Sequence, residues 1–174
     1  MPALETLHDL LVHELRDLFD AENQLIKALP LLAKAARNED LREAFELHTR
    51  ETKEHVRRLE TLFQALGTSP EGKKCKAMKG LVAEAKECIE EDADPDVLDA
   101  SLIVAAQKVE HYEIAGYGSA RTFARVLKYE DAARVLEETL KEESSTDERL
   151  TQLAQKINPK AESADEAEVQ QSAE

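Results

Sequence analysis

Charged side chains stand in the middle of the apolar stripe of each of the four long helical segments in this chain. The positions are Glu22 in the first segment, His48, Glu51 and His55 in the second, Glu110 and Glu113 in the third, and Glu143 and Asp147 in the fourth. Burying one carboxylate is costly, and converging carboxylates repel each other unless a cation neutralises them. The pattern therefore predicts a helix bundle that holds a dinuclear metal site in its core.

Apolar residues recur at steps of three and four along most of the chain, which predicts helices. We expect long helices over residues 3–37, 40–66, 95–127 and 129–157, with a kink in the first where Pro30 interrupts the pattern. Aromatic residues make up only 4% of the sequence, and Ala, Leu, Glu and Lys dominate it. This composition favours long helices and argues against an all-β fold.

The connection between the second and third long helices is unusually long. Antiparallel neighbours need only about 2–8 residues between them. Residues 71–94 instead begin with a basic stretch and continue as a short amphipathic helix. Such a connection traverses the bundle, so the predicted fold class is all-α: a ferritin-like antiparallel four-helix bundle with a long crossover carrying a short fifth helix.

The sequence changes character at Asn158-Pro159, which we expect to end the last long helix. Residues 1–157 are predicted to form the helical bundle. Residues 158–174 are rich in Ala, Glu, Ser and Gln, and we expect them to form an acidic, disordered tail.

The formal net charge of -14 disfavours binding to nucleic acid or to an anionic membrane. No apolar run approaches the length of a membrane span, and the N-terminus lacks the basic start and apolar run of a signal peptide. A cytoplasmic location is therefore expected. Cys75 and Cys88 form no CxxC motif, and we interpret them as reduced, apolar side chains.

The charged positions agree in height along the bundle. A helix rises about 1.5 Å per residue, so Glu22 and Glu51 both lie roughly 20–24 Å from the turn at Asn38. The same count places Glu110 and Glu113 level with the acids of the fourth helix, relative to a turn near Lys128. If the two hairpins pack side by side, all of these residues fall in one layer.

Spacing also suggests two related half-sites. Glu51 and His55 are four residues apart, as are Glu143 and Asp147, so each pair shares a helix face.

Several alternatives stay open for which of these residues bind metal. Either histidine, His48 or His55, and either glutamate, Glu110 or Glu113, can be the ligand. The acids can instead form ion pairs with Lys or Arg, Glu142 replaces Glu143 if the last helix is rotated, and Tyr112 and Tyr117 can hydrogen-bond to the site carboxylates. The oxygen-rich set favours two ions of Fe or Mn, with Zn also possible.

Five stretches of this chain resemble a known family. They are LRDLFDAENQL at 15–25, HTRET at 48–52, CKAMKGLVAEA at 75–85, AAQKVEHYEIAGYG at 105–118 and TLKEESSTDERLT at 139–151. The chain is similar over residues 4–157 to the bacterial YciE/YciF stress-response proteins, which are ferritin-like metal-binding proteins of a domain of unknown function. The resemblance implies a ferritin-like bundle with an added short helix, a homodimer and a role in stress protection.

The chain departs from the usual di-iron pattern, in which Glu-x-x-His occurs on two helices. Glu51 is followed three residues later by Glu54, and Glu143 by Thr146. Histidine stands instead at positions 48 and 55. The departure bears on whether the site holds metal and on which metal it prefers.

Two functional hypotheses follow, and the sequence does not decide whether the protein is an enzyme. In the first, a carboxylate-bridged pair of Fe or Mn ions reacts with O₂ or peroxide. In the second, the protein is a non-catalytic dimeric stress scaffold with a vestigial or empty site. An iron-storage cage fits less well with a short crossover helix and a dimer, and the absence of a CxxC pair argues against a rubredoxin-type iron. The sequence identifies no protein partner.

Overall fold

The computed structural model describes residues 4–171, with the side chains of residues 4–162, and every regular element in this range is a helix. The elements are α1 (Leu7–Ala35), α2 (Glu39–Ala65), α3 (Lys76–Glu90), α4 (Pro95–Val126) and α5 (Glu130–Gln171). The prediction of an all-α fold is confirmed. Among the described residues, no helix combines the length and the apolar character needed to span a membrane.

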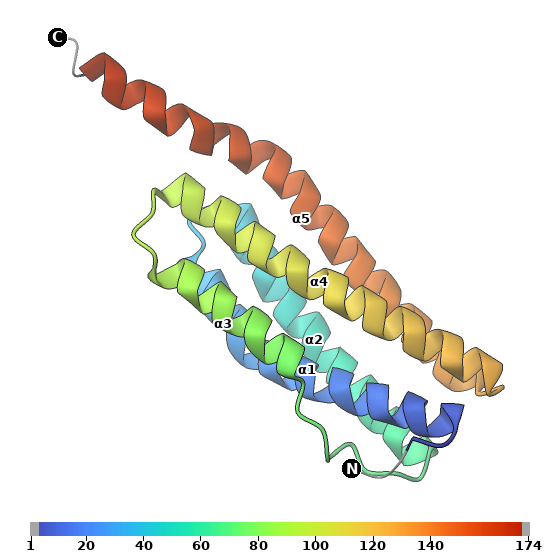
Figure 1. The fold of residues 1–174 in the computed structure, drawn as a ribbon. Coiled ribbons are helices and arrows are strands. Elements are labelled where there is room, and N and C mark those ends of the chain that lie inside the picture. The colour runs from blue at the N-terminus through green and yellow to red at the C-terminus, as the bar shows by residue number, and fades with distance from the viewer. Residues whose placement is uncertain (1–3, 172–174) are drawn as a thin grey trace.

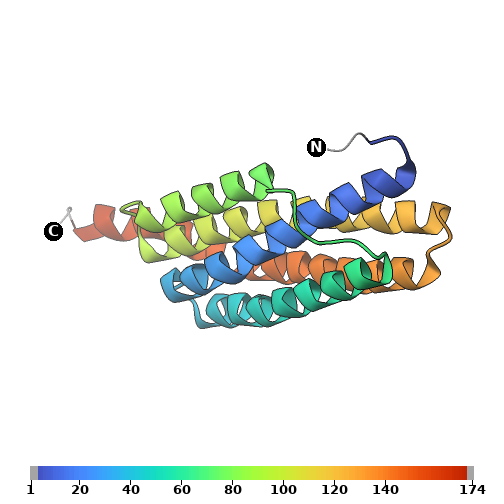
Figure 2. The ribbon, with the colours of Figure 1, turned by 90° about the horizontal axis from the view of Figure 1, so that it is seen from below.

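The four long helices lie alongside one another, with α1 packed on α2 and α4 packed on α5 (Figure 1). The two hairpins meet through α1 against α4 and α2 against α5. In Figure 2 the chain leaves the end of α2, returns through α3 toward the opposite end, and begins α4 there. The connection is thus a crossover that carries a short helix, as predicted, and α3 packs on α1 and α4.

Side-chain caps fix where these helices begin. Thr6 and Asp9 form a reciprocal capping box, which starts α1 at Leu7 rather than at the predicted residue 3. The Asn38 side chain accepts a hydrogen bond from the Leu41 amide at the start of α2. The buried Asp99 of α4 accepts hydrogen bonds from the Arg37 and Asn38 amides at 2.8 and 2.7 Å, and so ties the α1–α2 turn to the second hairpin.

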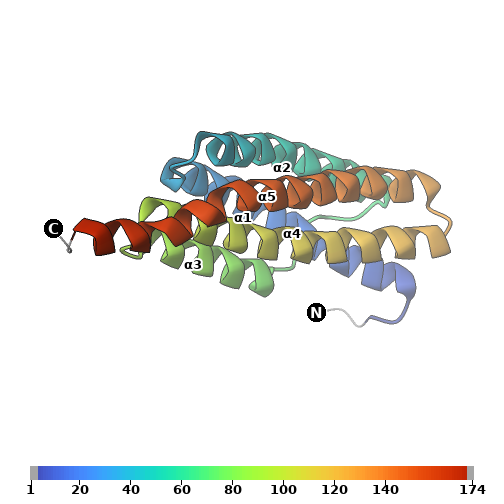
Figure 3. The ribbon, with the colours of Figure 1, turned by 90° about the horizontal axis from the view of Figure 1, so that it is seen from above.

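The prediction that the last helix ends at Asn158-Pro159 is wrong, because α5 continues to Gln171. Its C-terminal part extends past the ends of the other helices (Figure 3). Proline at position 159 removes the backbone hydrogen bond to the carbonyl of Gln155, but Gln155 is exposed, so water can satisfy the freed carbonyl. The neighbouring Ala and Glu residues are strong helix formers. The domain boundary at residue 157 stays a prediction, and residues 172–174 lie outside the described part.

Two apolar clusters fill the core, one on each side of a polar layer. One cluster contains Leu25 of α1, Phe45 of α2, Val109 of α4 and Leu150 of α5. The other contains Leu18, Leu59, Tyr117 and Leu136 of the same four helices. Each long helix therefore runs from apolar to polar to apolar, and the two clusters hold the polar layer at a fixed height.

Helices α1 and α4 approach closely beside this layer. A Cβ at Gly116 would lie 2.8 Å from Cδ2 of Leu18, a distance that packed side chains do not adopt. Glycine at this position lets α4 press against the segment of α1 that carries Glu22.

Candidate metal centre

Six ionisable residues make up the polar layer, and each is at most 2% exposed. They come from all four long helices: Glu22, His48, His55, Glu110, Glu113 and Glu143. All six were predicted as candidate ligands from the apolar stripe, and the structure brings them together in one layer. The layer is a buried constellation of four carboxylates and two imidazoles.

The six side chains form two groups that share one member. His48, Glu110, Glu113 and Glu143 each offer a ligand atom within 4.8 Å of the others, and so do Glu22, His55 and Glu143. Glu143 belongs to both groups. A carboxylate with one oxygen toward each group has the placement of a bridging ligand between two metal ions.

Individual distances show how Glu143 lies between the two histidines. Its Oε1 is 3.0 Å from Nδ1 of His55, and its Oε2 is 3.4 Å from Nε2 of His48. The other nitrogen of His48, Nδ1, lies 3.2 Å from Oε1 of Glu110. Nδ1 of His55 is also 3.3 Å from Oε1 of Glu22.

Most of these polar atoms have no aligned hydrogen-bond partner among the described residues. The unpartnered atoms are Oε2 of Glu22, Nε2 of His48, Nδ1 of His55, and both carboxylate oxygens of Glu110, Glu113 and Glu143. They are close enough to attract one another but do not point along one another's hydrogen-bond directions. Buried polar atoms are nearly always satisfied in native proteins. Oxygen and nitrogen atoms that converge without bonding to each other fit the ligand shell of divalent cations such as Fe, Mn or Zn.

The pKa values of the buried carboxyl groups show that their charged forms are unfavourable without a cation. Burial raises the pKa of Glu113, and the charges of Glu22 and Glu143 raise it further, well above its ordinary value. Burial likewise raises the pKa of Glu110 and of Glu22. Burial alone would raise the pKa of Glu143 too, but the nearby imidazoles of His48 and His55 lower it to about 2.

The histidines respond in the opposite direction. Burial would lower the pKa of His48, but the facing carboxylates of Glu110 and Glu143 raise it to about 9. Burial would lower the pKa of His55 in the same way, and Glu143 and Glu22 raise it to about 11. In the metal-free protein two imidazolium ions thus take the place that cations would fill, and metal binding must displace their protons.

These shifts predict that the metal-free protein loses stability as the pH rises. The pKa of His48 is raised from 6.5 to about 9, so its contribution is complete below pH 6.5 and is lost as the pH rises through 9. The raised pKa values of Glu110 and Glu113 act in the same sense, since the folded state favours their protonated forms. Denaturant unfolding of chelator-treated protein should show a midpoint that falls steadily between about pH 6.5 and 9. A flat midpoint across this range would contradict the assigned charge states.

Two predicted ligands lie outside the two groups. Glu51 is partly exposed, and its half-burial raises its pKa, but it is in neither group. Asp147 is also partly exposed, and Oδ1 and Oδ2 lie 3.1 Å from Gln107 Nε2 and 3.4 Å from His111 Nε2 respectively. The structure therefore does not support the predicted half-sites built on Glu51 with His55 and on Glu143 with Asp147.

Glu142, the alternative to Glu143 in the sequence analysis, does not replace it. Glu143 points into the layer, whereas Glu142 lies on the far side of the His55 ring, with Oε2 at 2.9 Å from Nε2. A contact of this kind depends on how α5 packs on α2, so no pattern in the sequence predicts it.

Both predicted tyrosines donate hydrogen bonds to carboxylates, but only one of the two accepting carboxylates belongs to the polar layer. Tyr117 donates to Glu22. Tyr112 instead donates to Asp17, an acid that the sequence analysis did not single out, and its hydroxyl lies 3.0 Å from Sγ of Cys75.

Cys75 belongs to a polar network that anchors the crossover. Its amide donates to Asp20 at 2.8 Å, and its thiol caps the start of α3. Cys75 and Cys88 are both free, as expected, but Cys75 has polar partners and is not simply an apolar filler.

Comparisons with known proteins agree on one family. A family model described as a domain of unknown function, DUF892, matches residues 6–162. The protein YciF of Escherichia coli K12 is 46% identical over 161 residues, which cover 91% of this chain and 97% of that protein.

Solved structures support the same relationship. The crystal structure of the E. coli stress protein YciF superposes with a TM-score of 0.87 at 45% identity and covers 90% of this chain and 99% of that one. A structure of YcfI from Rhodopseudomonas palustris gives a TM-score of 0.82 at 43% identity and covers 84% of this chain and 94% of that one. A protein from Xanthomonas campestris pv. campestris shares the fold, with a TM-score of 0.73 at 19% identity. The match covers 94% of this chain and 99% of that protein's chain.

Proposed function

The chain belongs to the DUF892 family, and we propose that it is a ferritin-like stress protein whose core binds two metal ions, with Glu143 available to both ligand groups. The family match confirms the resemblance seen in the sequence. The observation that carries the proposal is the set of buried, converging and unpartnered carboxylate and imidazole atoms from four helices. A hydrogen-bonded polar core would pair these atoms with one another.

Each ion has an identifiable set of ligands. His48, Glu110, Glu113 and Glu143 would hold one ion, and Glu22, His55 and Glu143 the other. Four carboxylates balance the charge of two divalent ions, with both histidines neutral. The oxygen-rich set suits Fe or Mn, and Zn is a further possibility. A bound pair of Fe or Mn ions supplies redox chemistry toward O₂ or peroxide.

The chain's own residues contribute positioning and exclusion of water. The apolar clusters on both sides of the layer keep bulk solvent away from the ligands. Tyr117 holds Glu22 through Oε1 and leaves Oε2 without a partner. The ligand groups are thus shielded from bulk solvent, and Glu22 is oriented without an ion.

Metal content tests this proposal directly. Protein loaded anaerobically with Fe(II) or Mn(II) and freed of excess metal should retain two ions per chain by elemental analysis. The loaded protein should then consume peroxide faster than the same amount of free metal. Retention of no metal would overturn the proposal. Two bound ions without peroxide consumption would leave the metal site standing and remove the redox activity.

One observation favours a second candidate. His48 and His55, when protonated, neutralise two carboxylates of the layer without any metal. The protein would then be a stress scaffold whose layer is a network of ion pairs. We further propose a homodimer in the cytoplasm for either function, on the strength of the family resemblance, and light scattering checks the oligomeric state.

A further inference from the structure

One of the two histidines in the layer also has a partner outside it. Nδ1 of His55 faces Glu143 and Glu22, while Nε2 lies 2.9 Å from Oε2 of Glu142. A neutral imidazole carries a proton on one nitrogen and a lone pair on the other. With the Nε2 proton donated to Glu142, the lone pair on Nδ1 points at the second ligand group.

Glu142 is itself held in place. The two terminal nitrogens of the Arg58 guanidinium contact it, Nη1 at Oε2 and Nη2 at 3.0 Å from Oε1. Nη1 of Arg58 also donates to Thr139 at 3.2 Å. A two-point contact between a guanidinium and a carboxylate fixes orientation as well as position. The order of contacts is therefore Arg58, Glu142, His55 and then the ligand group.

Among the described side chains, none outside the layer holds His48 as Glu142 holds His55. Both of its nitrogens face carboxylates that are members of the layer, Glu110 and Glu143. The two metal positions thus differ in how firmly their histidine is oriented, although each has one.

We propose that Glu142 is a positioning residue: it fixes the orientation of His55, so that Nδ1 is the ligand for the ion held with Glu22 and Glu143, and Arg58 in turn fixes Glu142. This inference rests on the proposed metal site. Outer-shell partners that accept a proton from a ligating histidine are typically worth about 10–100-fold in metal affinity.

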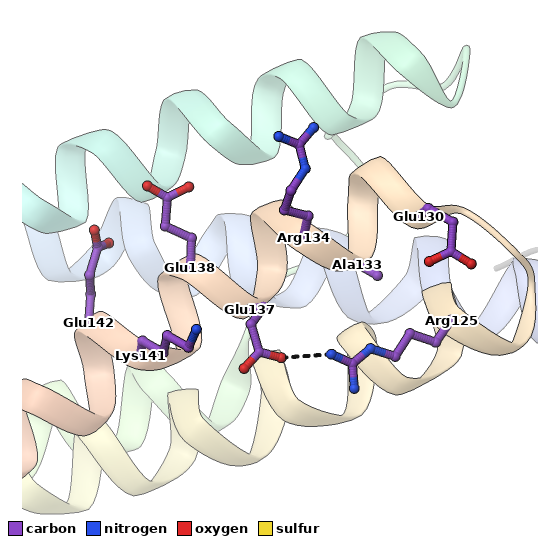
Figure 4. A pocket seen from close by; sticks show the side chains of 8 residues that line it. All are labelled: Arg125, Glu130, Ala133, Arg134, Glu137, Glu138, Lys141 and Glu142. Carbon is purple, nitrogen blue, oxygen red and sulfur yellow. Dashed lines mark hydrogen bonds and ion pairs between the residues drawn. The ribbon is translucent and has the colours of Figure 1, made fainter.

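A matched control stands one helical turn away. Glu138 and Glu142 line the same surface groove and extend side by side from α5 toward α2 (Figure 4). Nη2 of Arg58 contacts Oε1 of Glu138 at 3.1 Å, as it contacts Glu142, but Glu138 has no contact with His55 among the described side chains. Glu138→Ala therefore removes the same charge and an Arg58 contact without touching the histidine.

The experiment measures Co(II) binding by titration of its visible absorption in the unchanged protein, Glu142→Ala, Glu142→Gln and Glu138→Ala. We expect Glu142→Ala to weaken one of the two binding steps about 10–100-fold and Glu138→Ala to change neither by more than about 2-fold. Glu142→Gln keeps an oxygen that can accept the Nε2 proton and should restore part of the affinity. Equal binding by Glu142→Ala and Glu138→Ala would overturn the inference.

A second readout separates orientation from folding. In ¹⁵N-histidine-labelled, zinc-loaded protein, the His55 nitrogens should report a metal-bound Nδ1 and a protonated Nε2, and this signature should be lost in Glu142→Ala and kept in Glu138→Ala. A metal-bound Nε2 would overturn the inference while leaving the metal site intact. Failure of the unchanged protein to bind cobalt at all would overturn the proposed function and this inference with it.

Discussion

Glu143→Gln is expected to abolish the binding of both metal ions, because Glu143 is the one residue that belongs to both ligand groups. Each of its oxygens faces a different histidine, at 3.0 Å from His55 and 3.4 Å from His48. Glutamine keeps the size of the side chain but removes the charge and leaves only one oxygen. Since losing an outer-shell partner costs about 10–100-fold, losing a shared ligand should cost each ion on the order of 100-fold or more.

Single-group variants sharpen this prediction. Glu110→Gln removes a ligand from the first group only, and Glu22→Gln from the second only. Elemental analysis of protein loaded with Fe(II) should give no retained ion for Glu143→Gln and one for each of the other two. Glu148→Gln, at an exposed position of the same helix, should keep both ions. Loss of the same number of ions in Glu143→Gln and Glu110→Gln would show that Glu143 is not shared.

Folding of the Glu143 variant must be followed as well. In the metal-free protein this carboxylate is the counter-charge of two buried imidazoles. Removing one partner of a buried ion pair costs about 3–5 kcal/mol. Circular dichroism and an unfolding curve therefore accompany each metal measurement. If Glu143→Gln does not fold, the numbers of ions retained by Glu110→Gln and Glu22→Gln still test the two ligand groups.

The height of the site could be predicted from the sequence because it depends only on helix rise. The distances of Glu22, Glu110, Glu113 and Glu143 from their turns agree, and the caps that start α2 and α4 are readable as Asn38 and Asp94-Pro95. An error of one residue in the position of a turn lengthens one arm of the hairpin and shortens the other, which changes their relative height by only about 3 Å, roughly half a helical turn. The layer is therefore robust to such errors, and these four residues lie in it.

Rotation of a helix about its axis is harder to predict than height. On α5 the buried positions are 132, 133, 136, 139, 143, 146, 150, 153 and 157, so Thr146 lies inward where Asp147 was expected. On α2 the buried positions 48, 52 and 55 leave Glu51 about 60° from His48 around the helix. Residues at the edge of a stripe turn inward or outward according to the neighbouring helix. Glu51 and Asp147 were predicted as ligands because they are acidic and lie near the stripe, but helix packing leaves both partly exposed and outside the two ligand groups.

Contacts between distant segments gave no sequence signal at all. Asp17 and Tyr112 meet because α1 packs against α4, 95 positions away in the sequence. Glu142 reaches His55 across 87 positions of sequence. Such residues are indistinguishable from surface acids until tertiary packing brings their partners within reach. The roles of Asp17 and Glu142 were therefore missed, whereas the six residues of the buried layer were predicted.

Glu113→Met is expected to stabilise the metal-free protein and to weaken the metal-bound one. Both oxygens of Glu113 are buried without a hydrogen-bond partner among the described residues, and burial with the charges of Glu22 and Glu143 raises its pKa. An unsatisfied buried polar group costs about 1–3 kcal/mol, which methionine of similar length avoids. For a chain of this size each kcal/mol corresponds to about 2–4 °C, so the Tm in chelator should rise by roughly 2–12 °C.

Metal should reverse this order. Ions present at about a thousand times their Kd stabilise the folded state by about 4 kcal/mol per site, and Glu113→Met removes a ligand of the first group. Thermal unfolding of both proteins, with chelator and with Mn(II), should therefore give curves whose ranking changes with the metal. In a scaffold whose polar layer is satisfied by ion pairs, the variant would be less stable under both conditions. If the variant is the more stable protein in chelator and the less stable one with Mn(II), then Glu113 destabilises the metal-free fold and stabilises the metal-bound one. That is the behaviour expected of a metal ligand.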